Sequence, residues 1–212
     1  MIAETTQVLC GADLGSAKAL VNMGESSDEE LMIQLRQGED LALHELMRRW
    51  QLPLTRYIYR YVGNQTEALD VAQETFVRVF QQRHRFKEKL KFSAWLFAIA
   101  TNLCRNFLRW QSRHLSKASE YDQAEESWEA IQLTSQNSPD ELARLKESSE
   151  AVRRQVEALP DQLKAVVLLA DYEELAYRDI AEALGCSVKA VETRLYRAHK
   201  LLRERLRDLR SQ

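Results

Sequence analysis

Two carboxylates, Asp70 and Glu74, are the first side chains in this sequence whose spacing could support catalysis. They lie four residues apart in a segment with helical apolar spacing, so both would point from one helix face. Such a pair could serve as general acid and base, or could bind a metal ion. No histidine, third carboxylate or phosphate-binding loop stands beside them. We therefore interpret Asp70, Gln73 and Glu74 as a solvated face or a protein-docking face.

The cysteines do not indicate a metal site either. Cys10, Cys104 and Cys186 are far apart, match no metal-binding spacing and are odd in number. This usage favours a reduced, cytoplasmic protein with no metal and no cofactor. No apolar run of about 18 residues and no signal peptide is evident, so no membrane insertion is expected.

Basic side chains gather in two segments, although the formal net charge of the chain is only −2. Residues 83–113 and 187–210 are both rich in Lys and Arg, whereas residues 115–137 between them are acidic and rich in Ser and Gln. Two basic patches joined by an acidic tether indicate two separate contacts with nucleic acid.

The second basic segment has the pattern of a helix-turn-helix. A short helix is expected over 177–184, a turn at Gly185 and a long helix over 188–210 capped by Ser187. At the helical period, one stripe of the long helix is apolar and should face the core: Val188, Val191, Leu195, Ala198, Leu202 and Leu209.

The opposite arc of that helix carries polar and cationic side chains: Lys189, Glu192, Thr193, Tyr196, Arg197 and Lys200. Because the start of a recognition helix enters the major groove, we predict base contacts for Lys189, Glu192, Thr193 and Arg197. Tyr196 and Lys200, with Arg203, would contact the backbone or flanking positions. The alternative is an ordinary surface helix with a solvated basic face. Arg194 and Arg205 lie nearer the apolar stripe and should follow the edge of the core.

The first basic segment includes a helix expected over 92–113. Its polar arc combines an aromatic side chain with amides and cations: Trp95, Asn102, Arg105, Asn106 and Arg109. Such an arc could stack on unpaired bases and hold phosphates. A partly buried core aromatic is an equally good interpretation of Trp95 alone. Cys104 falls within the apolar arc and should pack inertly in the core.

Few Gly and Pro and abundant Leu, Ala, Glu and Arg predict an all-α fold of two helical domains joined by a flexible linker. The expected division is an N-terminal extension over 1–25, a first domain over 26–114, a linker over 115–137 and a helix-turn-helix domain over 138–212. Further helices are expected over 41–62, where Pro53 interrupts or kinks the helix, and over 66–83, 139–159 and 160–172.

Several segments together resemble the extracytoplasmic-function group of bacterial RNA polymerase sigma factors. They are DVAQETF at 70–76, FSAWLFAIATNLC at 92–104, LP at 159–160, YRDIAEALG at 177–185 and VKAVETRLYRA at 188–198. The resemblance implies a non-catalytic subunit that binds core RNA polymerase and promoter DNA, with an anti-sigma factor as a further partner.

The resemblance also assigns roles to the two domains. In the first, Asp70, Gln73 and Glu74 would face the polymerase, and the arc from Trp95 to Arg109 would face the minus-ten element. The loop before that arc would capture a flipped base through Phe86, Lys87, Lys89 and Lys91, although it is more basic than the usual loop of the family. The arc from Lys189 to Lys200 would read the minus-thirty-five element, and residues 115–137 would thread towards the polymerase active-site channel.

Two other functions make different predictions. An autonomous helix-turn-helix regulator with a sensing N-terminal domain would bind promoters without polymerase. An enzyme acting on nucleic acid through Asp70 and Glu74 would need a metal ion and would turn over substrate.

Overall fold

The computed structural model describes residues 25–114 and 149–210, with side chains as far as residue 207. Within these ranges the chain is helical and contains no strand, which confirms the predicted all-α class. The elements are α2 (Asp28–Arg36), α3 (Asp40–Val62), α4 (Gln65–Gln82), η1 (Arg83–Arg85), α5 (Phe92–His114), α7 (Asp161–Val167), η4 (Leu168–Tyr172), α8 (Tyr177–Ala183) and α9 (Val188–Arg210), and residues 149–157 are also helical. The predicted extension, apart from Glu25, and the predicted linker lie outside the described residues.

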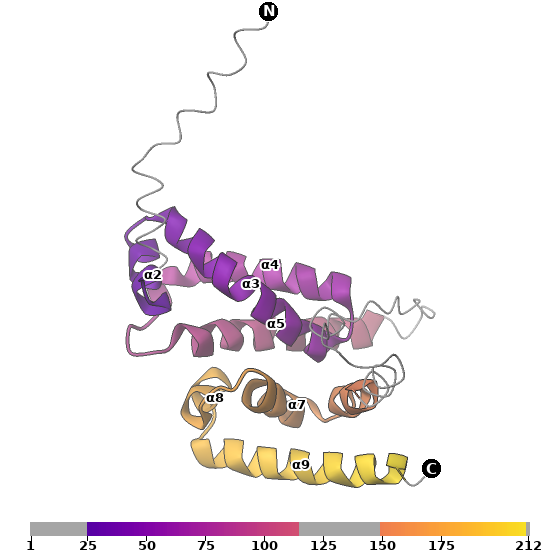
Figure 1. The fold of residues 1–212 in the computed structure, drawn as a ribbon. Coiled ribbons are helices and arrows are strands. Elements are labelled where there is room, and N and C mark those ends of the chain that lie inside the picture. The colour runs from indigo at the N-terminus through magenta and orange to yellow at the C-terminus, as the bar shows by residue number, and fades with distance from the viewer. Residues whose placement is uncertain (1–24, 115–148, 211–212) are drawn as a thin grey trace, which may run out of the picture.

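The N-terminal half, residues 25–114, is a bundle of α3, α4 and α5 with α2 across one end (Figure 1). Ser27 and Glu30 form a capping box that begins α2. The neighbouring Glu29 carboxylate accepts a hydrogen bond of 2.9 Å from the Phe92 N–H, one of the donors that the start of α5 leaves free. Residues far apart in the sequence thus fix where α5 begins.

Pro53 lies inside α3, and the helix runs on to Val62, so the predicted interruption at this residue is wrong. Proline removes one intrahelical donor, but eight side chains of α3 are buried in the bundle. Tertiary packing on both sides of Pro53 therefore outweighs the single lost hydrogen bond.

The C-terminal half, residues 149–210, forms the helix-turn-helix that the sequence predicts. Gly185 has φ of 62°, and the Ser187 hydroxyl accepts from the Ala190 N–H at 3.2 Å, so turn and cap are both confirmed. The segment expected as one helix over 160–172 begins as α7 and continues as the π-helical η4. Ala176 precedes α8 without any capping side chain.

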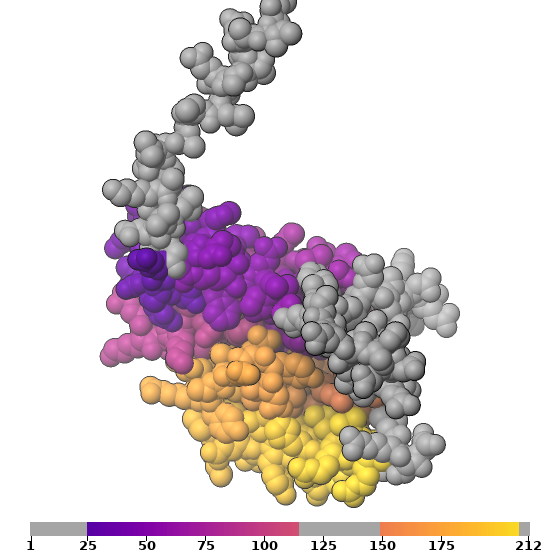
Figure 2. All heavy atoms as spheres, in the orientation of Figure 1, coloured from indigo at the N-terminus to yellow at the C-terminus, as the bar shows by residue number. Residues whose placement is uncertain are grey.

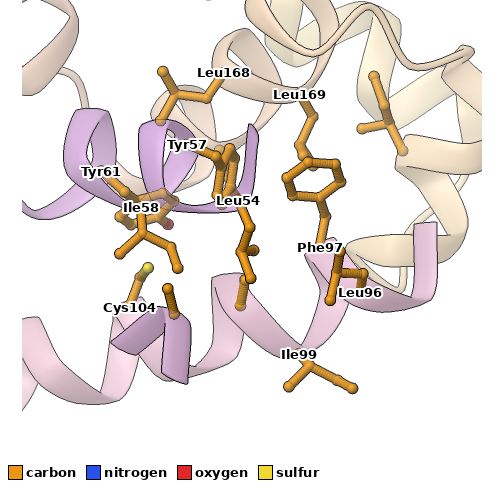
Figure 3. Packing of buried hydrophobic residues seen from close by; sticks show 14 of the residues in the cluster. Leu54, Tyr57, Ile58, Tyr61, Leu96, Phe97, Ile99, Cys104, Leu168 and Leu169 are labelled. Atoms are coloured by element: carbon orange, nitrogen blue, oxygen red, sulfur yellow. The ribbon is translucent and has the colours of Figure 1, made fainter. Parts of the chain in front are cut away.

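The two halves pack directly against each other, which the sequence did not predict. Figures 1 and 2 show α7 and α8 against the N-terminal half, with α9 on the far side. The buried apolar side chains of both halves form one continuous cluster. In Figure 3, Leu169 of η4 points towards Phe97 of α5, and both side chains are fully buried. We call this contact, made by α7, η4 and α8 on α3 and α5, the seam.

Candidate nucleic-acid and polymerase interfaces

The predicted reading arc of α9 is exposed along its whole length: Lys189, Glu192, Thr193, Tyr196, Arg197 and Lys200. Tyr196 is the extreme case, with 72% of its surface exposed. A large aromatic side chain held in solvent on a basic helix is typical of a surface that receives a partner. The arc is therefore available for DNA in this arrangement.

Short-range contacts order the start of this arc. The Lys189 ammonium lies 2.9 Å from a Glu192 carboxylate oxygen, and the Thr193 hydroxyl donates to the Lys189 carbonyl at 2.8 Å. Because the Lys189 side chain is 85% exposed, its ion pair contributes little and can be exchanged for a DNA contact at small cost.

The inner face of α9 follows the predicted stripe in its middle. Val191, Leu195 and Ala198 are buried, and Leu202 is half-buried. Val188 is 41% exposed, so its predicted place in the core is wrong. It is the first residue after the Ser187 cap, where α9 extends beyond the body that it packs against.

Two further arginines lie at the edge of that core. Arg194 and Arg205 are both half-buried, and Arg205 donates to the Ala158 carbonyl at 3.4 Å. Both therefore lie where the sequence placed them, away from the reading arc. The side chain of Leu209 lies outside the described residues.

The predicted polar arc of α5 divides into two parts. Asn102, Asn106 and Arg109 are exposed and lie one and two turns apart on one face. Arg105 is half-buried, and its guanidinium Nε donates to the Asp161 carboxylate at 2.9 Å. Three members of the arc are therefore open to solvent, whereas Arg105 is held by the C-terminal half.

Trp95 belongs to an aromatic cluster at the start of α5. Its ring centroid lies 5.3 Å from that of Phe86 and 6.4 Å from that of Phe92, and its side chain is half-buried. Phe86 is only 3% exposed, so in this arrangement its ring anchors the loop to the core. An aromatic side chain gains more from such a cluster than from exposure on a loop.

The loop before α5 presents its cations outwards. Lys87, Lys89 and Lys91 are exposed, with the half-buried Leu90 as a second anchor. The Lys91 ammonium lies 3.0 Å from Asp179 of α8, as an ion pair without well-directed hydrogen-bond geometry. This loop therefore also touches the C-terminal half.

The outer face of α4 carries Asp70, Gln73 and Glu74, all exposed as predicted, with Glu74 accepting from Arg78 at 2.8 Å. Leu69 and Phe80 follow the apolar period of α4 but are 37% and 36% exposed, and Val77 beside them is 47% exposed. The apolar stripe of α4 is wider than the bundle covers, because only α3 and α5 pack on it extensively.

Several ionisable residues at the seam had no role in the sequence interpretation. The Asp161 carboxylate accepts from the Tyr61 hydroxyl as well as from Arg105, so its two oxygens serve two helices of the N-terminal half. The buried Lys164 donates to the Tyr61 carbonyl at 3.4 Å, and burial lowers its pKa. Each of these residues lies in or beside an apolar helical run. No local sequence pattern shows whether a polar residue at such a position is buried at the seam or exposed to solvent.

Glu173 completes the polar part of the seam. Its carboxylate lies 3.8 Å from the Arg60 guanidinium, which also covers the Tyr172 ring at 4.5 Å. Burial raises the pKa of Glu173 to about 7, although Arg60 and Arg56 act in the opposite direction. Glu173 thus contacts α3 across the seam.

Other types of site are not evident within residues 25–114 and 149–210. These ranges contain no cluster of three or more His, Cys, Asp or Glu side chains that could hold a metal ion. Cys104 is fully buried, and burial raises the pKa of its thiol, consistent with the inert packing predicted for it. No helix in the described ranges is long and apolar enough to span a bilayer.

Comparison with known proteins matches both halves to one family. Residues 46–114 match the family model of sigma-70 region 2, and residues 149–202 match that of sigma-70 region 4. The chain is 30% identical to the ECF RNA polymerase sigma factor SigW of Bacillus subtilis over 177 residues, which cover 83% of this chain and 95% of SigW. The chain belongs to the extracytoplasmic-function sigma factors.

Further relatives agree with this assignment. The chain is 28% identical to the RNA polymerase sigma-H factor of Pseudomonas aeruginosa, covering 87% of this chain and 96% of that factor. Among solved structures, CnrH in complex with the cytosolic domain of CnrY aligns with a TM-score of 0.64 at 25% identity, covering 86% of this chain and 99% of CnrH. The sigma factor RpoE of Bartonella quintana, at 18% identity and a TM-score of 0.59, shows the same fold.

The sigma factor therefore has both regions that its family uses for promoter recognition, one in each half. As a sigma factor it directs core RNA polymerase to promoters and is an initiation factor. Nothing in the comparisons supports an autonomous helix-turn-helix regulator.

Proposed function

We propose that this sigma factor binds its two promoter elements and core polymerase through three separate surfaces. The exposed arc of α9 reads the minus-thirty-five element, the α5 arc with the loop before it opens and holds the minus-ten element, and the outer face of α4 docks on core polymerase. The chain performs no catalysis of its own and acts in the cytoplasm, where the polymerase is. CnrH was solved with a bound protein partner, and by this likeness we propose an anti-sigma factor as a regulatory partner here.

The observation that carries this proposal is the side-chain composition of the exposed arc of α9. Polar side chains, most of them donors or cations and one the carboxylate of Glu192, cover its outer face, while Val191, Leu195 and Ala198 fix the opposite face in the core. Arg197 lies on this outer face about two and a half turns after the start of the helix, which supports its assignment to a base edge in the major groove. Lys200 lies one turn further along, where a phosphate contact is expected.

The α4 surface supports a protein contact. Leu69, Val77 and Phe80 form an apolar strip in solvent beside Asp70 and Glu74. An apolar centre with a charged border is the usual anatomy of a protein interface. DNA would be repelled by the two carboxylates, so the polymerase is the more suitable partner for this face.

The first experiment is run-off transcription from a promoter library with purified core polymerase, with and without the chain. We expect initiation that depends on the chain and selects a subset of promoters. An absence of chain-dependent initiation would overturn the proposal. Once a promoter is selected, the separate surfaces can be tested on it.

The α9 surface is tested by measuring holoenzyme affinity for all single-base changes in the minus-thirty-five element. Arg197→Ala should cost about 1–3 kcal/mol and relax discrimination at one base pair, whereas Lys200→Ala should weaken binding to all sequences equally and reduce its salt dependence. An equal loss on every sequence for Arg197→Ala would reassign Arg197 to a phosphate.

The α4 surface is tested with Val77→Lys, which puts a charge into the apolar strip. We expect a loss of core polymerase binding of at least tenfold in a pull-down titration, without loss of thermal stability. Leu52→Lys is the matched control, because Leu52 is 44% exposed on α3, outside the strip. Equal binding by the two variants would exclude this face as the docking site.

A further inference from the structure

Two side chains of α2 contact the loop that the proposed function assigns to the minus-ten element. The Arg36 guanidinium lies 3.1 Å from a Glu88 carboxylate oxygen, and the Glu29 carboxylate accepts from the Phe92 N–H at 2.9 Å. We propose that α2 orders residues 86–91 into the shape that receives the minus-ten strand, with Glu29 and Arg36 as positioning residues. This inference rests on the proposed function, since it assumes that this loop binds the minus-ten element.

Helix α2 is itself firmly attached to the bundle. Leu31, Met32 and Leu35 are fully buried, and Figure 1 shows α2 across the end of the bundle at which α5 begins. The helix contacts both η1 and α5, the two elements that flank the loop. The family model of region 2 matches residues 46–114, so α2 lies before the matched range. A helix packed in this way can hold a neighbouring loop without moving itself.

The Glu29 contact fixes the point at which the loop ends and α5 begins. The first N–H groups of a helix have no partner within the helix, and Phe92 is fully buried, so an unpaired N–H there would be costly. A carboxylate satisfies this donor through a charge-assisted hydrogen bond and suits the positive end of the helix dipole. Loss of the Glu29 acceptor would therefore loosen the end of the loop rather than the bundle as a whole.

A second path joins the start of α2 to the same point. The Asp28 carboxylate accepts from the Trp50 indole N–H at 2.8 Å, and the Trp50 ring meets the Phe92 ring edge-on at 6.0 Å between centroids. The Phe92 ring in turn lies 6.4 Å from those of Phe86 and Trp95. Neighbouring carboxylates of α2 thus hold both the backbone and the ring of one residue.

The Arg36 contact neutralises the one acidic side chain of the loop. Residues 86–91 carry three lysines and Glu88, and an unpaired carboxylate among them would repel the DNA backbone. The side chains of Arg36 and Glu88 are 33% and 62% exposed, so their ion pair contributes little to folding stability. Its effect is on the charge of the surface that DNA meets.

The loop is ordered before DNA arrives. A flexible loop would lose conformational freedom on binding a strand, which would weaken the complex. Here the buried Phe86 holds the first residue, the Leu90 N–H donates to the Lys87 carbonyl at 2.9 Å, and α2 holds Glu88 and Phe92. We therefore expect both the affinity for an unpaired strand and the discrimination among bases to depend on α2.

The first test measures hydrogen exchange in the full chain by mass spectrometry. Glu29→Ala removes the acceptor for the Phe92 N–H, so exchange over residues 86–92 should become roughly tenfold faster. Glu30→Ala is the matched control, because it removes a carboxylate from the same helix and breaks the capping box without touching the loop. Unchanged exchange over residues 86–92 in Glu29→Ala, or the same increase in Glu30→Ala, would overturn the proposal.

The second test measures holoenzyme affinity for a single-stranded oligonucleotide. It carries the non-template minus-ten strand of a promoter selected from the library, and each single-base variant is compared with it. Glu29→Ala should bind it roughly three- to tenfold more weakly and discriminate less among the variants, whereas Glu30→Ala should behave as wild type. Glu29→Gln keeps a neutral acceptor and should recover most of the loss.

Two further affinities distinguish positioning from general destabilisation. Binding to core polymerase, and holoenzyme binding to a duplex that carries the minus-thirty-five element alone, should be the same for wild type, Glu29→Ala and Glu30→Ala. A merely structural role of Glu29 would lower all the affinities together and leave the ratios among bases unchanged. That result would overturn the proposal.

Arg36 is tested through its partner. Arg36→Gln leaves Glu88 unpaired and should weaken oligonucleotide binding roughly two- to fivefold, with a larger effect at low salt. The double variant Arg36→Gln, Glu88→Gln removes the carboxylate as well and should restore wild-type affinity. A double variant as weak as Arg36→Gln would show that Arg36 contacts DNA itself and would reject its positioning role.

These results also separate this inference from the proposed function. If the wild-type holoenzyme does not distinguish the minus-ten oligonucleotide from its variants, the proposed role of the loop fails, while hydrogen exchange still reports whether α2 orders the loop. If the wild type discriminates and Glu29→Ala discriminates equally well, the positioning role alone fails. Should Glu29→Ala fail to fold, Glu29→Asp keeps the charge, shortens the reach and takes its place in the same assays.

Discussion

Glu173 should make the stability of this sigma factor fall as pH rises through the neutral range. Its carboxylate is 11% exposed at the seam, and its pKa is raised from 4.5 to about 7 because burial disfavours the charged form. Between these two values the folded chain retains a proton that the unfolded chain has released. The folded state therefore binds more protons, and the free energy of unfolding decreases as pH rises from 4.5 to about 7.

The magnitude follows from the size of the shift. Each pKa unit corresponds to about 1.4 kcal/mol, so the rise from 4.5 to about 7 gives an upper limit of about 3.5 kcal/mol, and partial hydration of the carboxylate reduces the expected effect to roughly 1–3 kcal/mol. Glu173→Gln removes the titrating group while keeping its shape. The variant should match the wild type near pH 5 and exceed its stability by roughly 1–3 kcal/mol at pH 8.

The assay is urea unfolding at pH 5, 6, 7 and 8. Free energies of unfolding are compared between chains whose m-values, the slopes of that free energy against urea concentration, are equal. Subtracting wild type from variant cancels the contributions of all other titrating groups. Glu174→Gln is the control, because Glu174 is the exposed neighbour and carries the same charge. A difference between Glu173→Gln and wild type that stays constant from pH 5 to pH 8 would refute the burial argument.

Two further changes test the packing and the turn. Leu169→Ala, at a fully buried position of the seam, should lower the free energy of unfolding by about 2–5 kcal/mol in urea titrations, and a loss below 1 kcal/mol would show that the seam is loosely packed. Gly185→Ala should cost about 1 kcal/mol, since φ is 62° and an added Cβ meets no atom within 4 Å, so that backbone strain is the whole effect. A much larger loss for Gly185→Ala would indicate a clash at the turn.

The sequence predicted the helices well because the signals that begin and end a helix lie within a few residues of one another. The capping box at Ser27, the turn at Gly185 and the cap at Ser187 all act within a few residues, and the structure contains all three. The exposed arc of α9 was predictable for the same reason. The apolar stripe of α9 packs on α7 and α8 of the C-terminal half. The opposite face of α9 is therefore exposed to solvent.

Predictions failed where burial depends on elements distant in the sequence. Leu69 and Phe80 match the apolar period of α4, but α3 and α5 cover less of this helix than the pattern suggested. The resemblance assigned Phe86 to the base-capturing loop, and no local pattern indicated that its ring packs between Trp95 and Phe92. Periodicity shows which side chains could be buried, and only the packed neighbours decide which of them are.

Arg105 shows why the composition of a helix face alone could not identify the group that each side chain contacts. A guanidinium on a polar helix face suits a phosphate and a carboxylate equally, because both offer two oxygens to its donors. The composition of α5 suggested a promoter contact for Arg105, which stays a proposal, whereas its partner in the structure, Asp161, lies 56 residues further along the chain. In the free chain the packing of the two halves brings Asp161 to Arg105, and no local pattern in α5 indicates a contact with a residue so distant in the sequence.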